Sequence, residues 1–224
     1  MNLALIGYGK MGHAVEAAAI ERQHTIVATI DNEEDWLQKA DALRKSNVAL
    51  EFSTPDTAVQ SIRRLLGMGL PVVSGTTGWY DQLDKVAEEC RQVGGRLLVA
   101  SNFSIGMNIV FDINRRLARL MNGHPEYSAT ITETHHIHKL DAPSGTAISL
   151  GKIVDEAGGY KTPITSQRIG EVPGIHTLTL TGGCDKITLS HEAFSREGLA
   201  QGAVEAALMT ERVSGVHEFK DLII

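Results

Sequence analysis

Short apolar runs alternate with amphipathic stretches over the first half of the chain. The apolar runs are rich in Val, Leu and Ile and are bounded by turn residues, which is typical of buried strands. They lie at 3–6, 25–30, 48–52, 71–74 and 96–100, and helical patterns separate them at 11–20, 57–68 and 80–93. Because strands that alternate with helices form parallel βαβ units covered on both faces, this half predicts an α/β domain on a parallel sheet.

The pattern changes after residue 102. Alternating apolar and polar side chains predict a strand with one open face before the central histidines. The turn Gly182–Asp185 separates two further runs that we expect to pair as antiparallel strands. The predicted helices lie at 107–121, 144–156 and 199–213, and the predicted strands at 127–135, 176–181 and 186–191. These elements indicate a second domain of α+β type, with hinges expected near 102–104 and 195–196.

Composition and charge argue against several classes of protein. The 224 residues carry a net charge of −6, whereas a general nucleic-acid binder normally presents a basic face. The longest apolar stretches are far shorter than a membrane span, so no membrane partner is expected. The first strand starts at residue 3, which leaves no room for a signal peptide, and Cys90 and Cys184 have no C-x-x-C spacing. We therefore expect a cytoplasmic protein with reduced thiols.

A glycine-rich loop follows the first predicted strand and opens the first helix. Its sequence, Gly7-Tyr8-Gly9-Lys10-Met11-Gly12, fits the dinucleotide-binding fingerprint G-x-G-x-x-G. Gly7 allows the tight turn, Gly9 lets the backbone approach a pyrophosphate, and Gly12 lets the helix pack closely. The N-terminus of the helix then faces the phosphates. This context indicates a site for a nicotinamide dinucleotide.

The choice between NADH and NADPH depends on Asp31, at the end of the second predicted strand. An acidic side chain about 20 residues after the glycine loop accepts the ribose hydroxyls of NADH. Residues 32–35 read Asn-Glu-Glu-Asp, contain no arginine for a 2′-phosphate, and would repel that phosphate. We therefore favour NADH over NADPH, although Lys10 could compensate in part. The acidic run is equally well interpreted as a solvated helix start.

Two further loops are expected at the carboxyl ends of parallel strands, where doubly wound sheets bind ligands. They are Gly75-Thr76-Thr77-Gly78 after the fourth strand and Ala100-Ser101-Asn102-Phe103 after the fifth. Both combine small residues with hydroxyl or amide groups that suit a nicotinamide carboxamide. Taken alone, each is better interpreted as a plain turn.

The densest chemistry of the chain lies in residues 133–147, Glu-Thr-His-His-Ile-His-Lys-Leu-Asp-Ala-Pro-Ser-Gly-Thr-Ala. Pro143 ends the preceding strand, and Ser144 is a natural N-cap for the helix that follows. Gly145 and Thr146 then present backbone N–H groups in the first turn, which forms an anion site. Lys139 adds a positive charge nearby. We expect a carboxylate group of an acidic substrate to bind here.

Three histidines stand beside this anion site. A histidine donates or accepts a proton near neutral pH, so His135 or His136 is a candidate general acid. Neighbouring residues of a continuing strand point to opposite faces, so both can face one ligand only if the strand ends there. His138 completes the cluster, but neither the one-turn spacing nor the cysteines of a typical zinc site are present, so we expect no metal.

The motif E-x-H-H-x-x-K-x-D-A-P-S-G-T-A resembles the signature of the 4-hydroxy-tetrahydrodipicolinate reductase (dihydrodipicolinate reductase) family of bacterial lysine and diaminopimelate synthesis. The likeness covers essentially the whole chain in family order. It includes the loops at 7–12, 75–78 and 100–106 and the segments 174–177, 191–196 and 219–222. Many family members carry G-x-x-G-x-x-G, and this chain has one residue fewer before Gly9. It is also shorter after the second strand and between residues 160 and 174.

The resemblance implies a function and a role for each matching position. The function is NAD(P)H-dependent reduction of a small cyclic dicarboxylate, 4-hydroxy-tetrahydrodipicolinate, to tetrahydrodipicolinate. His135 would be the catalytic proton donor or acceptor, and Lys139 a second proton donor. The implied substrate positions are His136, Gly145 and Thr146, joined by Ser144 at the helix start, and the cofactor positions are residues 7–12, Asp31, Gly75, Thr76, Thr77, Ala100, Ser101, Asn102 and Phe103.

The family fold is a Rossmann-like nucleotide domain formed by both chain ends, with a substrate domain that commonly builds a tetramer. We thus expect a dinucleotide-binding domain of residues 1–103 with 197–224, and a substrate-binding and oligomerisation domain of residues 104–196. Two alternatives stay open. A related two-domain dehydrogenase of an amino acid or sugar would not need the H-H-x-x-K and P-S-G-T pairing. A cofactor-binding redox sensor without turnover would keep its ligand affinity when His135 and Lys139 are replaced.

Overall fold

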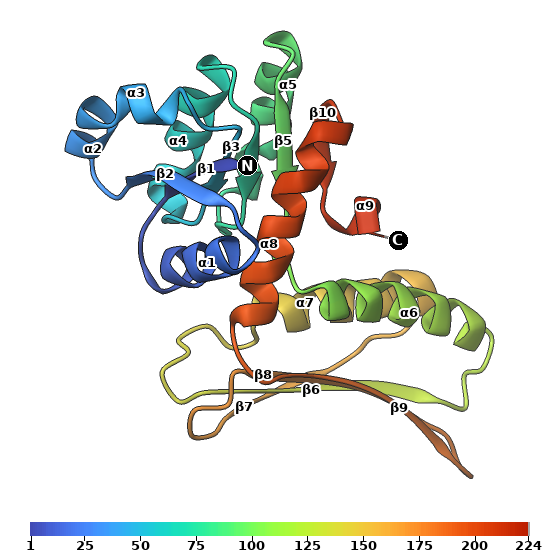
Figure 1. Cartoon of the computed structure of the whole chain (residues 1–224). Helices are drawn as coiled ribbons and strands as arrows, with labels where there is room; N and C mark the ends of the chain where they lie inside the picture. The colour runs from blue at the N-terminus through green and yellow to red at the C-terminus, as the bar shows by residue number, and fades with distance from the viewer. Residues whose placement is uncertain (224) are drawn as a thin grey trace. The chain divides into compact units, whose positions relative to one another are not determined.

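The structure, a computed structural model, describes residues 1–223. The chain separates into two compact units, Met1–Ser104 with Glu197–Ile223, and Ile105–Arg196. Both ends of the sequence therefore build the first unit, and the middle of the sequence builds the second (Figure 1). Within residues 1–223, no helix has the length and apolar character needed to cross a membrane.

The first unit contains a six-stranded sheet in the order β10-β5-β4-β3-β1-β2. Every neighbouring pair of strands is parallel, so the predicted Rossmann-like architecture is confirmed. The strands are β1 (Asn2–Ile6), β2 (Thr25–Ile30), β3 (Val48–Glu51), β4 (Val72–Ser74), β5 (Arg96–Val99) and β10 (Gly215–Glu218).

Helices cover both faces of this sheet, and β1 shows why its sequence is apolar throughout. Leu3 and Leu5 pack in a core with α1 and α8, whereas Ala4 and Ile6 point to the opposite face and pack with α4 and α5. A strand buried on both faces has no polar side to alternate with. The helices are α1 (Lys10–Glu21), α2 (Glu33–Gln38), α3 (Ala40–Leu43), α4 (Pro55–Gly67), α5 (Leu83–Gln92), α8 (Glu197–Met209) and α9 (Lys220–Ile223), with short 3₁₀ turns η1 (Tyr80–Gln82) and η2 (Thr210–Arg212).

The order of strands in the sheet reverses at β1. From β1 the chain builds β2 on one side, then returns to add β3, β4 and β5 on the other. In doubly wound sheets, ligands bind outside the carboxyl ends of the strands at such a point. The glycine-rich loop follows β1 directly, and Asp31 follows β2. The topology therefore brings the predicted dinucleotide-binding residues to one place.

The second unit has a mixed sheet in the order β7-β6-β8-β9, covered on one face by two helices (Figure 1). β8 is antiparallel to β9, as the turn at 182–185 predicts, and also to β6, whereas β7 is parallel to β6. Ile131, Leu150 and Leu178 are buried between the helices and the sheet. The elements are α6 (Ile105–Met121), β6 (Ser128–His135), α7 (Gly145–Gly158), β7 (Ile164–Arg168), β8 (Gly174–Thr181) and β9 (Lys186–Ala193).

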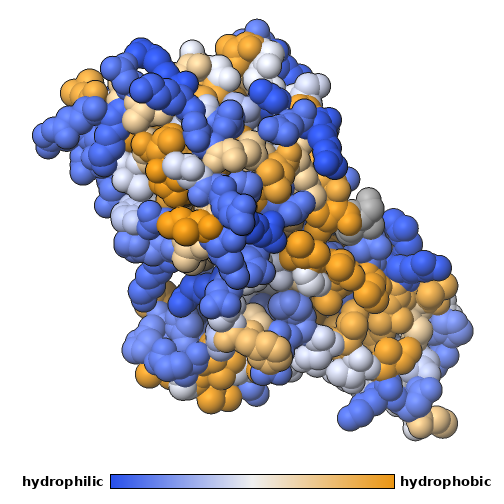
Figure 2. Space-filling model, in the orientation of Figure 1, coloured by the Kyte–Doolittle hydropathy of each residue, from blue (hydrophilic) through white to orange (hydrophobic). Residues whose placement is uncertain are grey.

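The helix α6 also carries an exposed apolar stripe. Ile105, Ile109 and Ile113 are spaced by four residues, share one side of the helix, and keep 40%, 44% and 44% of their surface exposed. Hydrophobic side chains gather over this helix in Figure 2. These isoleucines are distinct from Met107 and Phe111, which α6 buries within the second unit.

The sequence pattern does not predict the strands β7 and β10, and α8 ends earlier than predicted. The strand β7 reads Ile-Thr-Ser-Gln-Arg and β10 reads Gly-Val-His-Glu, so neither contains an apolar run that would mark it. The helix predicted to end at residue 213 ends at Met209. There the Thr210 hydroxyl donates to the Ala207 carbonyl at 2.7 Å, and a 3₁₀ turn follows.

Candidate functional site

A cavity of about 450 Å³ opens at the carboxyl ends of β1, β2 and β3. Its volume is within the range of small-molecule sites. The glycine-rich loop, the end of β2 and the start of α4 supply most of its wall, through Gly7, Tyr8, Gly9, Asp31, Asn32, Phe52, Ser53, Thr54 and Thr57. This cavity lies where a doubly wound sheet binds a dinucleotide.

The three glycines of the loop meet different steric demands. Gly7 has φ +84°, and a Cβ there would lie 2.3 Å from the Phe52 carbonyl oxygen. A Cβ at Gly12 would lie 2.5 Å from the Gly7 carbonyl oxygen, so α1 can pack against the loop only without it. A Cβ at Gly9 would meet nothing within 4 Å, and Gly9 starts α1 without a side-chain cap. Gly9 therefore leaves open space in front of the first N–H groups of the helix.

The other residues of the loop and Asp31 surround the same opening. The Asp31 carboxylate accepts a hydrogen bond from the Tyr8 backbone N–H at 2.8 Å and lines the cavity. The Tyr8 hydroxyl donates to Glu16. Lys10 is exposed, while Met11 is half-buried against the core. Asp31 is thus fixed to the glycine-rich loop while still facing the cavity.

An arginine that the sequence analysis did not consider lies beside the acidic run after Asp31. Arg64, from α4, pairs with Glu33 at 3.1 Å, and its guanidinium carbon lies 4.7 Å from the centre of the Trp36 ring. Lys39 likewise pairs with Asp35 at 2.7 Å. These cations neutralise part of the acidic run, so the repulsion expected for a 2′-phosphate is weaker than the local sequence indicates. Helical contacts between α2 and α4 cannot be inferred from the spacing of charges along the chain.

A buried carboxylate joins the loops that follow β3 and β4. Glu51, fully buried at the end of β3, accepts hydrogen bonds from the Ser53 N–H at 2.9 Å and hydroxyl at 2.5 Å. It also accepts from the hydroxyls of Ser74, at 2.6 Å, and Thr76, at 2.7 Å. The apolar pattern places Glu51 inside the third predicted strand and assigns it no role, although a charged residue that ends an apolar run is a recognisable signal.

The two loops expected to hold the nicotinamide differ in how their side chains lie. A Cβ at Gly75 would lie 2.1 Å from the Phe52 ring, which explains this glycine, while Thr77 is exposed. Ser101 is exposed, Ala100 is half-buried, and the Asn102 side chain accepts from the Ser104 N–H at 2.8 Å. Phe103 is buried against Phe52 and Phe219. Because the Phe103 side chain belongs to the core, only its backbone is suited to contact a ligand.

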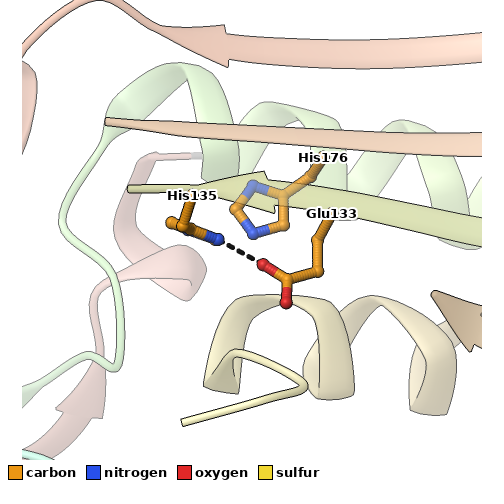
Figure 3. A group of neighbouring side chains, drawn as sticks. All are labelled: Glu133, His135 and His176. Atoms are coloured by element: carbon orange, nitrogen blue, oxygen red, sulfur yellow. Dashed lines mark hydrogen bonds and ion pairs between the residues drawn. The ribbon is translucent and has the colours of Figure 1, made fainter. Parts of the chain in front are cut away.

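In the second unit, Glu133, His135 and His176 converge on the helical side of the sheet (Figure 3). Glu133 and His135 are two residues apart on β6 and therefore share a face. His135 Nδ1 donates a hydrogen bond to Glu133 Oε2. His176 on β8 is the register partner of Glu133, and the centroids of the His176 and His135 rings lie 5.0 Å apart. All three residues are buried.

An arginine holds the other oxygen of Glu133. Arg168, at the end of β7, is paired in register with His135 and donates from Nη2 to Glu133 Oε1 at 2.9 Å. Burial alone would raise the pKa of Glu133, but hydrogen bonds from Ser166, Arg168 and His135 hold that pKa below its usual range. Burial lowers the pKa of His135, and the attraction of Glu133 offsets this only in part. Glu133 is therefore a carboxylate, and His135 is neutral at rest.

At the start of α7, where the sequence predicts an anion site, the chain places one of its own carboxylates. Ser144 caps the helix by accepting from the Ala147 N–H at 3.2 Å. The Asp141 carboxylate hydrogen-bonds the backbone of Gly145 and pairs with Lys139 Nζ at 2.7 Å. Burial alone would raise the pKa of Asp141, but Lys139 and the backbone donors lower it. Lys139 and Gly145 thus share a carboxylate, which belongs to Asp141 and not to a ligand.

The remaining predicted residues lie around these two clusters. The Ser144 hydroxyl also contacts His176 Nε2 at 3.2 Å, which connects the start of α7 to the buried histidines. β6 ends at His135, and the His136 ring lies near Arg196, with 3.4 Å between Nε2 and a guanidinium nitrogen. His138 pairs with Glu171 at the surface. Thr146 is half-buried in the first turn of α7.

Comparisons with known proteins identify the family of this chain. A family model described as dihydrodipicolinate reductase, N-terminus, matches residues 1–103, and one described as dihydrodipicolinate reductase, C-terminus, matches residues 106–223. The 4-hydroxy-tetrahydrodipicolinate reductase of Christiangramia forsetii is 40% identical over 235 residues, which cover 100% of this chain and 98% of that protein. The reductase of Methanopyrus kandleri is 32% identical, over 80% of this chain and 72% of its own length.

Solved structures share the fold. The dipicolinate-bound dihydrodipicolinate reductase from Paenisporosarcina sp. TG-14 has a TM-score of 0.82 and 22% identity, and the match covers 99% of each chain. A probable dehydrogenase from Thermotoga maritima has a TM-score of 0.61 and 12% identity, over 100% of this chain and 93% of its own. Family models match both halves of the chain, and a reductase is 40% identical along its full length. This chain therefore belongs to the dihydrodipicolinate reductase family.

Proposed function

We propose that this protein reduces 4-hydroxy-tetrahydrodipicolinate to tetrahydrodipicolinate with NAD(P)H, a step of diaminopimelate and lysine biosynthesis. The hydride goes from C4 of the nicotinamide to the substrate ring, one proton is taken up, and one water is lost. The observation that carries the proposal is the Glu133–His135 pair beside the Lys139–Gly145 carboxylate site, in a chain of this family. The pair supplies a proton-transfer group next to a place for an acidic substrate.

The cavity at the ends of β1–β3 is the site we assign to the cofactor. The open N-terminus of α1 suits the pyrophosphate, and Asp31 suits the ribose. The loops after β4 and β5, with Thr76, Thr77 and residues 100–103, lie further along the same sheet edge and would hold the nicotinamide. The cofactor supplies the hydride when bound, and the residues of this unit orient it.

We infer NADH as the preferred cofactor, because Asp31 presents a negative charge where NADPH carries its 2′-phosphate. Arg64 and Lys39 reduce the repulsion, so the expected preference is modest. The test compares kcat/KM for NADH and NADPH in the wild type and in Asp31→Ala. The replacement should raise the ratio of NADPH to NADH activity. A wild type that prefers NADPH would show that the charge argument is wrong.

The substrate is a dianion at neutral pH, and we assign one of its carboxylates to the position that Asp141 occupies. Lys139, the Gly145 N–H and the capped start of α7 would hold this group, with His136 and Thr146 as further contacts. A dianion next to His135 would favour the protonated imidazole, since an opposite charge raises the pKa of a histidine. His135 would then deliver the proton that accompanies hydride transfer.

The decisive assay follows NADH oxidation at 340 nm with substrate made freshly from pyruvate and aspartate semialdehyde. The wild type should turn over, and Lys139→Met should lose rate and substrate affinity while it keeps its NADH affinity. A folded protein that binds NADH without turnover would instead support the cofactor-binding sensor. Turnover of an amino acid or sugar in place of this substrate would support the related dehydrogenase.

The same family likeness supports a homo-oligomer, which we propose to be a tetramer of the second unit. The apolar stripe on α6 and the open face of the β6–β9 sheet both belong to that unit. Light scattering coupled to size-exclusion chromatography measures the mass directly. A mass of one chain, 24.2 kDa, at micromolar concentration would refute the tetramer.

A further inference from the structure

We propose that Glu133 is a positioning residue for His135: it fixes the imidazole with its hydrogen on Nδ1, so that Nε2 is the atom that exchanges the proton with the substrate. Arg168 in turn holds Glu133 in place. This inference rests on the proposed function, in which His135 is the proton donor.

The first support is the geometry of the buried pair. Glu133 and His135 point to the same face of β6, and their hydrogen bond joins Oε2 to Nδ1 (Figure 3). A carboxylate has no hydrogen to give, so the hydrogen in this bond must be on Nδ1. A neutral imidazole carries only one N–H, and Nε2 is then left with its lone pair. Adding a proton to His135 must place it on Nε2.

The second support is the way in which Glu133 is held. Its side chain is completely buried, and Arg168 Nη2 donates to Oε1 at 2.9 Å. The Arg168 side chain also donates to the backbone carbonyls of Lys139 and Asp141, at 3.4 Å and 2.5 Å. One guanidinium therefore fixes both the carboxylate behind His135 and the segment that carries Lys139. A charged residue is costly to bury unless it is paired, and here the pairing leaves the carboxylate oriented toward His135.

The third support is the space around Nε2. Gly174, the first residue of β8, lies beside it, and a Cβ there would be 3.0 Å from Nε2. Any other residue at position 174 would crowd this nitrogen. The His176 ring packs against the His135 ring with an angle of 71° between the two ring planes. Its Nε2 is directed to the Ser144 hydroxyl. The His176 ring restricts rotation of the imidazole. Because Gly174 has no side chain, Nε2 stays uncovered on that side.

The same three residues have the composition of a metal site, since their ligand atoms lie within 4.8 Å of one another. Two contacts favour positioning over metal binding. Both oxygens of Glu133 are already used, one by His135 and one by the positively charged Arg168. A divalent cation would have to displace the hydrogen from Nδ1 and would lie next to a guanidinium. We therefore expect full activity after dialysis against EDTA.

The charges that face His135 determine what loss of Glu133 should do. They are Glu133 itself, Lys139, Arg168 and the neighbouring His176. Burial, Lys139 and Arg168 all disfavour the imidazolium, and Glu133 favours it. Removing the negative charge in Glu133→Gln should therefore move the basic limb of the kcat/KM–pH profile to lower pH by about one unit or more.

The experiment compares Glu133→Gln, Glu133→Ala, His135→Asn and the double variant Glu133→Gln/His135→Asn by steady-state kinetics. Glu133→Gln should lower kcat by about 10²-fold, with the KM for substrate changed by less than about threefold. Glu133→Ala should lose more, and the double variant should be no slower than His135→Asn. Asp155→Asn is the matched control, because the Asp155 carboxylate also accepts two hydrogen bonds, from Thr162, but lies at the other end of α7. It should leave kcat and the pH profile unchanged.

Nitrogen NMR of histidine side chains gives a readout that does not depend on turnover. His135 should show the Nδ1–H tautomer in the wild type and a mixture of tautomers in Glu133→Ala. An Nε2–H tautomer in the wild type would overturn the proposal even if the Glu133 variants fail to fold. So would a folded Glu133→Gln with wild-type kcat and pH profile, or activity that EDTA abolishes. Full activity of His135→Asn would instead overturn the assignment of His135 in the proposed function.

Discussion

Replacement of Glu51 should weaken both the fold of the first unit and its cofactor site. Oε1 accepts three hydrogen bonds, from the Ser53 N–H, the Ser53 hydroxyl and the Thr76 hydroxyl, and Oε2 accepts one from Ser74. In Glu51→Gln the amide oxygen can take the three bonds at Oε1, while Ser74 can rotate to accept from the new NH₂ group. The pattern of bonds survives, but the charge does not.

The size of the effect follows from these four bonds. A hydrogen bond to a charged group contributes about 1.5–3 kcal/mol, against about 0.5–1.5 kcal/mol between neutral groups, so four bonds lose roughly 4 kcal/mol. A neutral amide costs less to bury than a carboxylate, which offsets about half of this loss. We expect Glu51→Gln to lower the free energy of unfolding by about 2 kcal/mol. Glu51→Leu, which strands the donors, should lower it by about 3–5 kcal/mol.

The assay is urea denaturation followed by circular dichroism, together with NADH binding followed by fluorescence. Ser53 lines the cavity, so Glu51→Gln should also weaken NADH binding by about three- to tenfold. Glu21→Gln, an exposed glutamate of α1, is the control and should change neither quantity. Wild-type stability and NADH affinity in Glu51→Gln would refute the idea that this carboxylate holds the two loops together.

Three further predictions concern other parts of the molecule. Burial lowers the pKa of His176 to about 4, so the unfolded state binds the proton first as pH falls from 6.5 to 4. The free energy of unfolding, measured by urea titration, should therefore fall by about 3 kcal/mol over this interval, and by less in His176→Gln. Gly202→Ala would place a Cβ 1.8 Å from the Phe103 carbonyl oxygen and should destabilise the protein by about 1–3 kcal/mol in thermal unfolding, whereas Gly198→Ala on the same helix meets nothing within 4 Å. Asp141→Asn removes the internal anion from Lys139 and should tighten binding of dipicolinate, measured by calorimetry, by about fivefold, equivalent to about 1 kcal/mol.

Each of these expectations has a clear contrary result. Equal pH dependence in wild type and His176→Gln would mean that this histidine takes up its proton without cost to the fold. Equal stability of Gly202→Ala and Gly198→Ala would mean that α8 moves away from Phe103 easily. Weaker dipicolinate binding in Asp141→Asn would show that Asp141 orients Lys139 for the ligand rather than competing with it.

The sequence predicts the parallel sheet well because its strands are buried on both faces. β1 is an unbroken apolar run, and the loop that follows it has glycines at the required spacing. The strands β7 and β10 could not be found in this way. Residues of β7 such as Thr165 and Gln167 are polar and exposed, and β10 is fixed as a strand by its pairing with β5 rather than by its own composition.

The candidate site shows the same division between local and tertiary information. The capped start of α7 and the end of β6 at His135 are local features, and the sequence predicts both. Arg168 and His176 reach Glu133 only because β7 and β8 flank β6 in the sheet. The central motif contains Asp141, but the residue types do not specify the turn that brings its carboxylate to the start of α7.

The split construction of the first unit has a consequence for how the protein is made. Residues 105–196 form a contiguous unit and can complete their contacts while the rest of the chain is still being synthesised. The first unit must wait, because β10 can pair with β5 and Phe219 can pack on Phe103 only after residues 215–219 have left the ribosome. Until then the edge of β5 is unpaired, and unpaired strand edges promote association between chains. Slow synthesis of the segment that carries β10 and Phe219, or its loss, would therefore prolong the period in which the nascent protein is prone to aggregate.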